Sequence, residues 1–204
     1  MASEEAIGPQ MCRIVLVRHA LAGGDGRFQG QLDVPLTAKG RRQLSNLTGK
    51  LSRYPIRAVY SSDLRRAQAT AEATARKLGV KLEMRSGLRE MHFGSWQGMS
   101  WKQIARRHPR LSALWITRFP RQQIPGAECF DKFVRRVRNE MRELIAVSQG
   151  LCVLAVTHAG VIRVALATAL GMQVRNLFRL ALDPCSISVI DYFREGVVVR
   201  CING

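Results

Sequence analysis

The run Ile14-Val15-Leu16-Val17, followed by Arg18-His19-Ala20 and the turn Gly23-Gly24-Asp25-Gly26, decides the fold of this chain. Four consecutive apolar residues rich in strand formers predict a buried strand, and a guanidinium and an imidazole follow where it ends. A strand end holds side chains stiffly, and glycines let the backbone come close to a ligand. The stretch therefore predicts a nucleophilic histidine in an anion site, with an ordinary polar strand end as the alternative interpretation.

A second histidine also follows a predicted buried strand. The apolar run Leu151–Val156 ends at Thr157-His158-Ala159-Gly160, and a helical stretch begins there. Ligands of open parallel sheets bind outside the carboxyl ends of the strands. We therefore expect His19 and His158 to converge, although they lie far apart in the sequence. A structural histidine at either position remains the alternative.

A third strand end precedes a helix with two arginines near its start. Residues 57–60 read as a short strand, and Ser61-Ser62-Asp63 leads into a helix over residues 63–78. We expect Ser or Asp to cap this helix and its exposed amides to attract an anion. We expect the guanidinium group of either Arg65 or Arg66 to bind two phosphate oxygens in a bidentate contact, and the other arginine to be a solvated charge.

One carboxylate stands among aromatic residues and glycines. It is Glu90, in the stretch from Leu88 to Gly98. A carboxyl group in partly apolar surroundings can hold or deliver a proton near neutral pH, as a departing alkoxide requires. A surface glutamate paired with Arg89 or another neighbour is the alternative interpretation, and His92 is expected to pack or bind water rather than react.

Strands that alternate with helices predict an α/β fold: a three-layer sandwich with a central, mostly parallel sheet, helices on both faces and a small helical cap over residues 96–127. Residues 1–10 are expected to be a flexible leader, and residues 11–204 a single domain with ample apolar material, since 47% of the chain is hydrophobic. The predicted strands are 12–17, 57–60, 80–84, 151–156, 185–191 and 196–202, and the predicted helices are 37–53, 63–78, 100–108, 110–118, 128–149, 159–170 and 174–179.

Charge and cysteine content bear on partners and compartment. The net charge of +17 would draw in phosphorylated or carboxylated substrates and also cause nonspecific binding to nucleic acid. A dedicated nucleic-acid role is disfavoured because the arginines are spread among helices with few aromatic residues between them. Five cysteines, read as reduced and mostly buried thiols, together with the absence of a signal core or a membrane-spanning run, predict a cytoplasmic protein with no membrane partner.

Five ordered blocks resemble the histidine phosphatase superfamily, which includes phosphoglycerate mutases. The opening block is Leu16-Val17-Arg18-His19 with Arg27-Phe28-Gln29-Gly30, Asp33–Thr37 and Gly40. The later blocks are Ser61-Ser62-Asp63-Leu64 with Arg66-Ala67 and Thr70, Leu88-Arg89-Glu90 with Phe93-Gly94 and Trp96, Pro125-Gly126-Ala127-Glu128, and Thr157–Arg163.

This resemblance implies a mechanism position by position. His19 would attack phosphorus and form a phosphohistidine, with Arg18, Arg66 and charged His158 around the phosphoryl oxygens, while Glu90 would protonate the leaving oxygen and later activate water. Phosphoryl transfer mainly needs positioning and neutralisation of negative charge, which these groups can supply without a metal. No spacing typical of metal ligands occurs in the sequence, so we expect no metal and no cofactor.

The loop after His19 departs from the family. Ala20 stands where many members have Gly, and the segment up to Gly26 is short and lacks the family's phosphate-binding Asn. Backbone amides of Gly23 and Gly24 could form an anion-binding nest in its place, and Arg27 could add charge. A packing or gating arginine over the loop is the alternative interpretation of Arg27.

The short cap favours a phosphomonoester hydrolase of a small phosphorylated metabolite over a phosphoglycerate mutase. Chain length, the segment from Glu90 to Trp96 and the closing segments Phe178–Leu180 and Ile187–Val189 are similar to α-ribazole phosphatases of cobalamin biosynthesis, which makes α-ribazole 5′-phosphate a candidate substrate. A phosphohistidine protein phosphatase and a noncatalytic basic binding protein are the other interpretations. The sequence is also compatible with a homodimer.

Overall fold

The computed structural model describes residues 11–24 and 26–204 of the chain. The predicted leader, residues 1–10, and Asp25 of the glycine-rich turn lie outside the described residues. Every predicted strand occurs with boundaries within two residues of the expected ones, and so does every predicted helix. The segment expected as a helix over 174–179 is a 3-10 helix, η3 (Val174–Arg179).

The described residues form one six-stranded sheet in the order β3-β2-β4-β1-β5-β6. Strands β1, β2, β3 and β4 run parallel, β5 is antiparallel to β1, and β6 is antiparallel to β5. The prediction of a mostly parallel sheet is confirmed. The strands are β1 (Cys12–Arg18), β2 (Ile56–Ser61), β3 (Leu82–Met84), β4 (Cys152–Thr157), β5 (Ile187–Tyr192) and β6 (Val197–Cys201).

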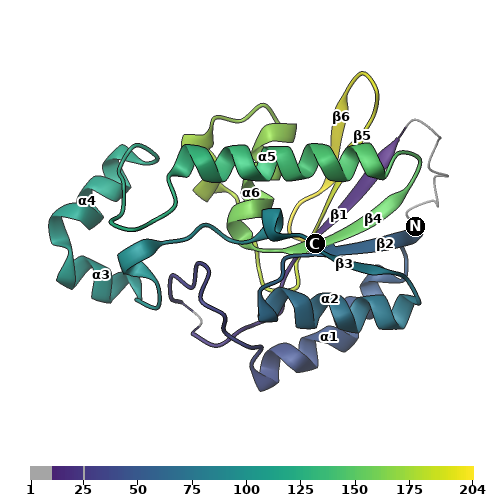
Figure 1. Cartoon of the computed structure of the whole chain (residues 1–204), viewed down its shortest axis with the longest axis horizontal. Coiled ribbons are helices and arrows are strands. Elements are labelled where there is room, and N and C mark those ends of the chain that lie inside the picture. Colours follow the sequence, from purple (N-terminus) through teal and green to yellow (C-terminus); the bar gives the residue numbers. More distant parts are fainter. Residues whose placement is uncertain (1–10, 25) are drawn as a thin grey trace.

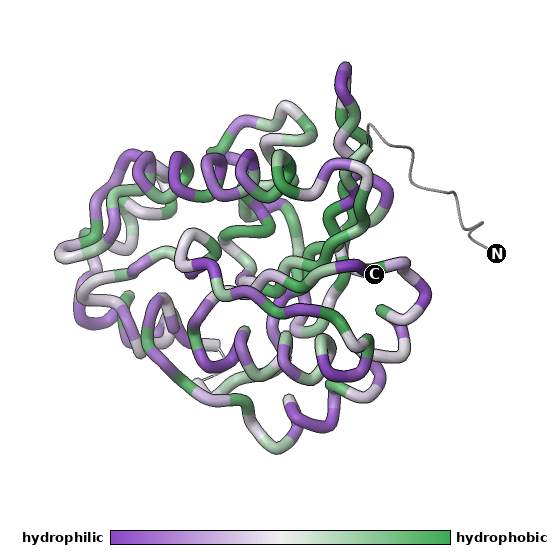
Figure 2. The backbone as a smooth tube through the Cα atoms, turned by 45° about the vertical axis from the view of Figure 1, so that its right-hand side comes forward, coloured by the Kyte–Doolittle hydropathy of each residue, from purple (hydrophilic) through white to green (hydrophobic). Residues whose placement is uncertain are grey.

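Alternate residues of β1 belong to two different cores, because successive side chains of a strand point to opposite faces of the sheet. Ile14 and Leu16 pack with residues of α5 (Phe130–Val147) and α6 (Ala159–Ala169). Val15 and Val17 pack with residues of α1 (Ala38–Leu51) and α2 (Arg65–Leu78). Figure 1 shows the two helix pairs on opposite sides of the sheet, and Figure 2 shows hydrophobic residues along the central strands between them. This is the predicted three-layer arrangement.

The predicted cap segment forms a small subassembly at one end of the molecule (Figure 1, left). It contains the short 3-10 turn η2 (Gly94–Trp96) and the helices α3 (Trp101–Arg107) and α4 (Pro109–Arg118). The capping box of Ser100 and Gln103 starts α3, as the sequence predicts. Trp96 and Trp115 are buried in a separate apolar cluster, whereas Trp101 is 36% exposed. The cap therefore has its own small core, and Phe93 and Phe119 pack against both this core and the main one.

No helix within residues 11–24 and 26–204 combines the length and the apolar character needed to cross a membrane.

Candidate active site

The two histidines meet at the carboxyl ends of neighbouring parallel strands. Strands β1 and β4 pair with Arg18 opposite Thr157, and the backbone N–H of His19 donates to the Thr157 carbonyl at 2.9 Å. The imidazole rings of His19 and His158 lie with centroids 5.1 Å apart in an edge-on arrangement. Both side chains are buried. The expected convergence of the two strand ends is therefore present in the fold.

The hydrogen bonds of His19 select its tautomer. Nδ1 lies 2.8 Å from the carbonyl oxygen of Ala20, which can only accept, so Nδ1 carries the ring proton. Nε2 is left with a lone pair and accepts from Nε of Arg66 at 3.2 Å. Burial, followed by the positive charge of Arg66, lowers the pKa of His19 from 6.5 to about 3. The imidazole is therefore neutral near pH 7, and its one ring lone pair, on Nε2, is engaged by the hydrogen bond from Arg66.

Arg66 approaches His19 from the first turn of α2. Its side chain is 1% exposed, and its guanidinium donates to the carbonyls of Gly30 at 2.6 Å and Leu32 at 2.7 Å. Its neighbour Arg65 points to the exposed surface. The prediction that one arginine of this pair serves the site and the other is solvated agrees with this geometry.

His158 is held by Ser62, the residue that directly follows β2. Its Nε2 lies 2.9 Å from Oγ of Ser62, and its buried Nδ1 has no hydrogen-bond partner among the described residues. Burial lowers the pKa of His158 well below its ordinary value, and the charges of His19, Arg66 and Arg18 act in the same direction. In the protein without a ligand, His158 is therefore neutral, mainly because it is buried and secondly because its surroundings are positive. The charged His158 expected around a phosphoryl group stays a prediction.

Arg18 completes the positive side of the site. Its Nη1 donates to the carbonyl of Leu182 at 2.6 Å, which holds the guanidinium at the end of β1. The positive charge of Arg18 contributes to the lowered pKa of both histidines. Arg18 therefore belongs electrostatically to the same site as Arg66.

Glu90 lies on the segment between η1 (Ser86–Leu88) and η2. One of its oxygens accepts from the backbone N–H of Gly160 at 3.0 Å, in the first turn of α6, and the other accepts from Met91 at 2.9 Å. Its charge is also among the neighbours that raise the pKa of Arg66. The alternative pairing with Arg89 does not occur. Glu90 is therefore tied to the turn that follows His158.

The predicted cap of α2 is wrong. No side chain caps this helix at its N-cap residue, Leu64. The Arg65 amide donates instead to Oδ1 of Asp33 at 2.8 Å, and Asp63 forms a two-pronged ion pair with Arg89 at 2.6 Å. A carboxylate from a distant loop thus occupies the helix start where an anion was expected.

The glycine-rich turn and Arg27 show no described contact with His19. The Gly23 amide donates to the Pro35 carbonyl at 3.0 Å, so it is not free to join an anion-binding nest, and Gly24 has a positive φ of 72°. Arg27 donates to the Gly98 carbonyl at 2.9 Å and to Gln103 Oε1 at 3.0 Å. These contacts fit the alternative interpretation of Arg27 as an arginine that packs the loop against the cap.

Sequence reasoning missed one arginine that holds the Glu90 segment. Arg136, on α5, donates to the carbonyls of Gly87 and Arg89, both at 2.8 Å. The same guanidinium binds both oxygens of Glu128 at 3.0 and 2.8 Å. Glu128 stands in one of the family-like blocks, which was the only available signal. Arg136 therefore fixes the backbone that carries Glu90.

The buried cysteines and His92 take no part in this arrangement of charged groups. Burial raises the pKa of the Cys12 and Cys152 thiols to about 12, so neither is a nucleophile near neutral pH. All five cysteines are unpaired. Nδ1 of His92 accepts from the Gly94 amide at 3.1 Å, in line with the packing role expected for it. Among the described residues, no group of three or more His, Cys, Asp and Glu side chains could hold a metal ion.

Residues 14–204 match the family model described as "Histidine phosphatase superfamily (branch 1)". A bifunctional protein of Mycobacterium tuberculosis is 34% identical over 195 residues, which cover 94% of this chain and 53% of that protein. The chain thus spans about half the length of this relative. Phosphoserine phosphatase 1 of Hydrogenobacter thermophilus is 28% identical over 195 residues, with 95% and 92% covered. The α-ribazole phosphatase of Shigella flexneri superposes with a TM-score of 0.83 at 27% identity, with 94% and 96% covered.

Proposed function

Because this chain belongs to the histidine phosphatase superfamily, we propose that it is a metal-independent phosphomonoester hydrolase that acts through a phosphohistidine on His19. The observation that carries the proposal is the state of this imidazole. It is buried and neutral, its Nδ1 proton is held by the Ala20 carbonyl, and its Nε2 faces Arg66.

In the first step, Nε2 of His19 attacks phosphorus, so that a P–N bond forms and the P–O bond to the leaving group breaks. Negative charge spreads over the other phosphoryl oxygens. Arg18 and Arg66 neutralise it, and the buried, unpartnered Nδ1 of His158 becomes a further contact for one oxygen. An arriving phosphate also compensates the positive charges that add to burial in keeping His158 neutral in the free protein.

Glu90 handles the proton in both steps. Its carboxyl group protonates the leaving oxygen, and the resulting carboxylate then takes a proton from the water that attacks phosphorus. The second attack breaks the P–N bond, releases inorganic phosphate and restores His19. The contact of Glu90 with the Gly160 amide supports this role, because it anchors the carboxylate beside the turn that carries His158.

The substrate class is a small phosphorylated metabolite. The names of two similar proteins, a phosphoserine phosphatase and an α-ribazole phosphatase, both specify small phosphomonoesters. We take α-ribazole 5′-phosphate as the first candidate because the resemblance in the segment from Glu90 to Trp96 points the same way. The unpaired thiols support a cytoplasmic location.

The test is release of inorganic phosphate in the presence of a chelator from α-ribazole 5′-phosphate, phosphoserine, 3-phosphoglycerate and nitrophenyl phosphate. His19→Ala should abolish release and remain folded, whereas His108→Gln, a change on the cap, should keep full activity. Trapped enzyme should carry an acid-labile phosphoryl group that His19→Ala lacks. Activity that survives in His19→Ala, or that returns only with added Mg²⁺, would contradict the proposal. Isomerisation of 3-phosphoglycerate without phosphate release would identify a mutase instead.

A further inference from the structure

A second cavity lies between α5 and α6, away from the histidines. It has a volume of about 350 Å³, within the range of small-ligand pockets. Thr168, at its edge, is ten residues beyond His158, so ~15 Å of α6 separates the two places. The apolar part of its wall consists of Val137, Met141, Ile145, Val164 and Ala165.

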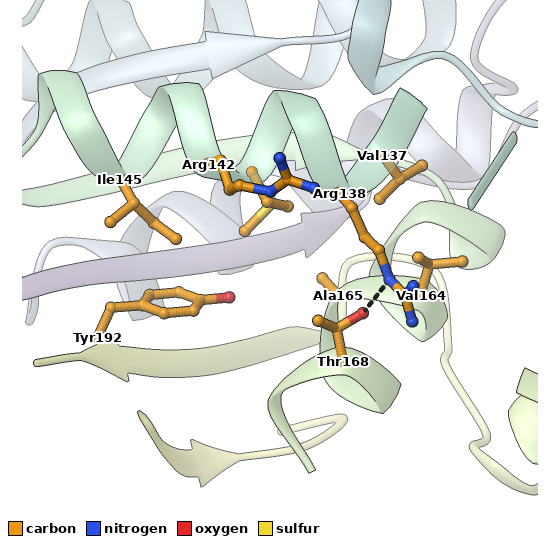
Figure 3. Close-up of a pocket in the computed structure, with 9 residues that line it drawn as sticks. Val137, Arg138, Arg142, Ile145, Val164, Ala165, Thr168 and Tyr192 are labelled. Carbon is orange, nitrogen blue, oxygen red and sulfur yellow. Dashed lines mark hydrogen bonds between the residues drawn. The ribbon is translucent and has the colours of Figure 1, made fainter. Parts of the chain in front are cut away.

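Four polar side chains surround this apolar wall (Figure 3). Arg138 donates through Nε to Oγ1 of Thr168 at 3.2 Å, and this bond crosses from α5 to α6. Arg142 lies one turn further along α5. The hydroxyl of Tyr192, on β5, points into the space beneath α5 and forms no hydrogen bond with a described residue (Figure 3).

The charges at this cavity are not balanced by the protein. Neither Arg138 nor Arg142 forms an ion pair with a carboxylate in the described part of the chain. The nearest acidic residue in sequence, Glu143, faces Arg85 instead. Arg138 and Arg142 are both exposed at the mouth of the cavity, where water solvates them. Like charges at positions i and i+4 of a helix repel each other, so an anion between the two guanidinium groups would relieve this repulsion.

We propose that this cavity binds an amphipathic anion: an apolar body that lies against the α5–α6 wall and a carboxylate or phosphate head group that Arg138 and Arg142 hold. The Tyr192 hydroxyl donates to the head group or to a polar atom next to it. The charge of the arginines and the apolar wall select this class together, because a neutral apolar ligand leaves the guanidinium groups unpaired and a bare anion leaves the wall in water. The site is separate from the proposed hydrolysis of phosphomonoesters.

Calorimetric titration of the full chain tests the proposal. Octanoate and octyl phosphate are the amphipathic probes, and octanol and inorganic phosphate each lack one half of the chemistry. Titrations use His19→Ala, so that octyl phosphate is not consumed and binding cannot depend on the catalytic histidine. Both amphipathic anions should bind at a single site about tenfold or more tighter than octanol or inorganic phosphate.

Two double variants are compared, and each removes two positive charges from α5. Arg138→Gln with Arg142→Gln should weaken octanoate binding about tenfold or more, whereas Lys132→Gln with Arg135→Gln, at exposed positions that do not line the cavity, should leave it unchanged. Tyr192→Phe should weaken it by a smaller factor. In the His19-containing background, all of these proteins should hydrolyse nitrophenyl phosphate as the unmodified chain does, which confirms that they are folded.

Three outcomes would overturn the proposal. Equal affinity in the two double variants would show that octanoate binds elsewhere. Octanol that binds as tightly as octanoate would remove the role of the arginines, and inorganic phosphate that binds as tightly as octyl phosphate would remove the role of the apolar wall.

Discussion

Acidification should destabilise the folded protein through His19. The folded state lowers the pKa of this imidazole from 6.5 to about 3, chiefly because it is buried and secondly because Arg66 is positive. Between these two values the unfolded chain binds a proton that the folded chain does not. The contribution of His19 to stability is therefore complete above about pH 6.5 and is lost as the pH falls toward about pH 3. The slope approaches ~1.4 kcal/mol per pH unit.

From about pH 7.5 to about pH 5, this single group should reduce the free energy of unfolding by ~2 kcal/mol, since a pKa near 3 leaves the folded imidazole unprotonated throughout. Urea unfolding followed by tryptophan fluorescence measures this difference, because Trp96 and Trp115 are buried in the folded state. The unmodified chain should lose more stability over this interval than His19→Gln by about that amount. His158, whose pKa is also lowered, adds a loss in the same direction in both proteins.

His108→Gln is the matched control, because this histidine lies on the half-buried start of α4 rather than in the site. It should keep the full pH dependence of the unmodified chain. A His19→Gln protein with the same pH dependence as the unmodified chain would refute the reasoning, since it would mean that His19 titrates alike in the folded and unfolded states.

Two further substitutions test how Glu90 is held, and a labelling experiment tests the burial of β1. Gly160→Ala should lower kcat roughly 100-fold, because the new Cβ would collide with Oε1 of Glu90 and displace it. Gly49→Ala is the control in the same assay, because a Cβ at this position meets open space. Arg136→Lys should lower kcat about tenfold with little change in the melting temperature, because an ammonium cannot reproduce the planar set of hydrogen bonds by which the guanidinium holds the Glu90 segment. An unchanged kcat would show that these hydrogen bonds do not position Glu90. Cys12 should resist alkylation at about pH 8 until urea unfolds the chain, because its thiol is buried and protonated; rapid labelling of the native protein, counted by mass spectrometry, would contradict this.

The parts of the fold that were predictable are those with a local pattern. The apolar runs before His19 and His158 mark β1 and β4, and the rule that parallel strands place their carboxyl ends together brings the two histidines into one site. The cap of α2 was not predictable in the same way. Asp63 had the right residue type and place, but Arg89 binds its carboxylate, and Asp33 reaches the helix start from a loop far away in the sequence.

The contacts of Arg136 in the site could not be predicted from a local sequence pattern either. Its guanidinium joins α5 to the Glu90 segment across more than forty positions, and no periodicity or spacing encodes such a contact. The predicted anion-binding nest in the loop after His19 is not supported by the contacts of Gly23, for a related reason. A glycine-rich turn indicates conformational freedom, but the partner of each amide depends on the opposite segment, and Pro35 takes the Gly23 amide. Side-chain and amide partners between distant segments become visible only in the folded structure.

In a chain with a net charge of +17, the arginines near the proposed site differ in the kind of group that holds them. Arg89 and Arg136 are held by carboxylates, which orient the guanidinium and also cancel its charge. Arg66 is held by two backbone carbonyls, which orient the guanidinium equally well but leave its charge in place. The field of that remaining charge adds to burial, which is the larger cause, in lowering the pKa of His19. The same field favours a phosphate at this position, so a carboxylate in place of either carbonyl would preserve the geometry of Arg66 and weaken the binding of the phosphoryl group.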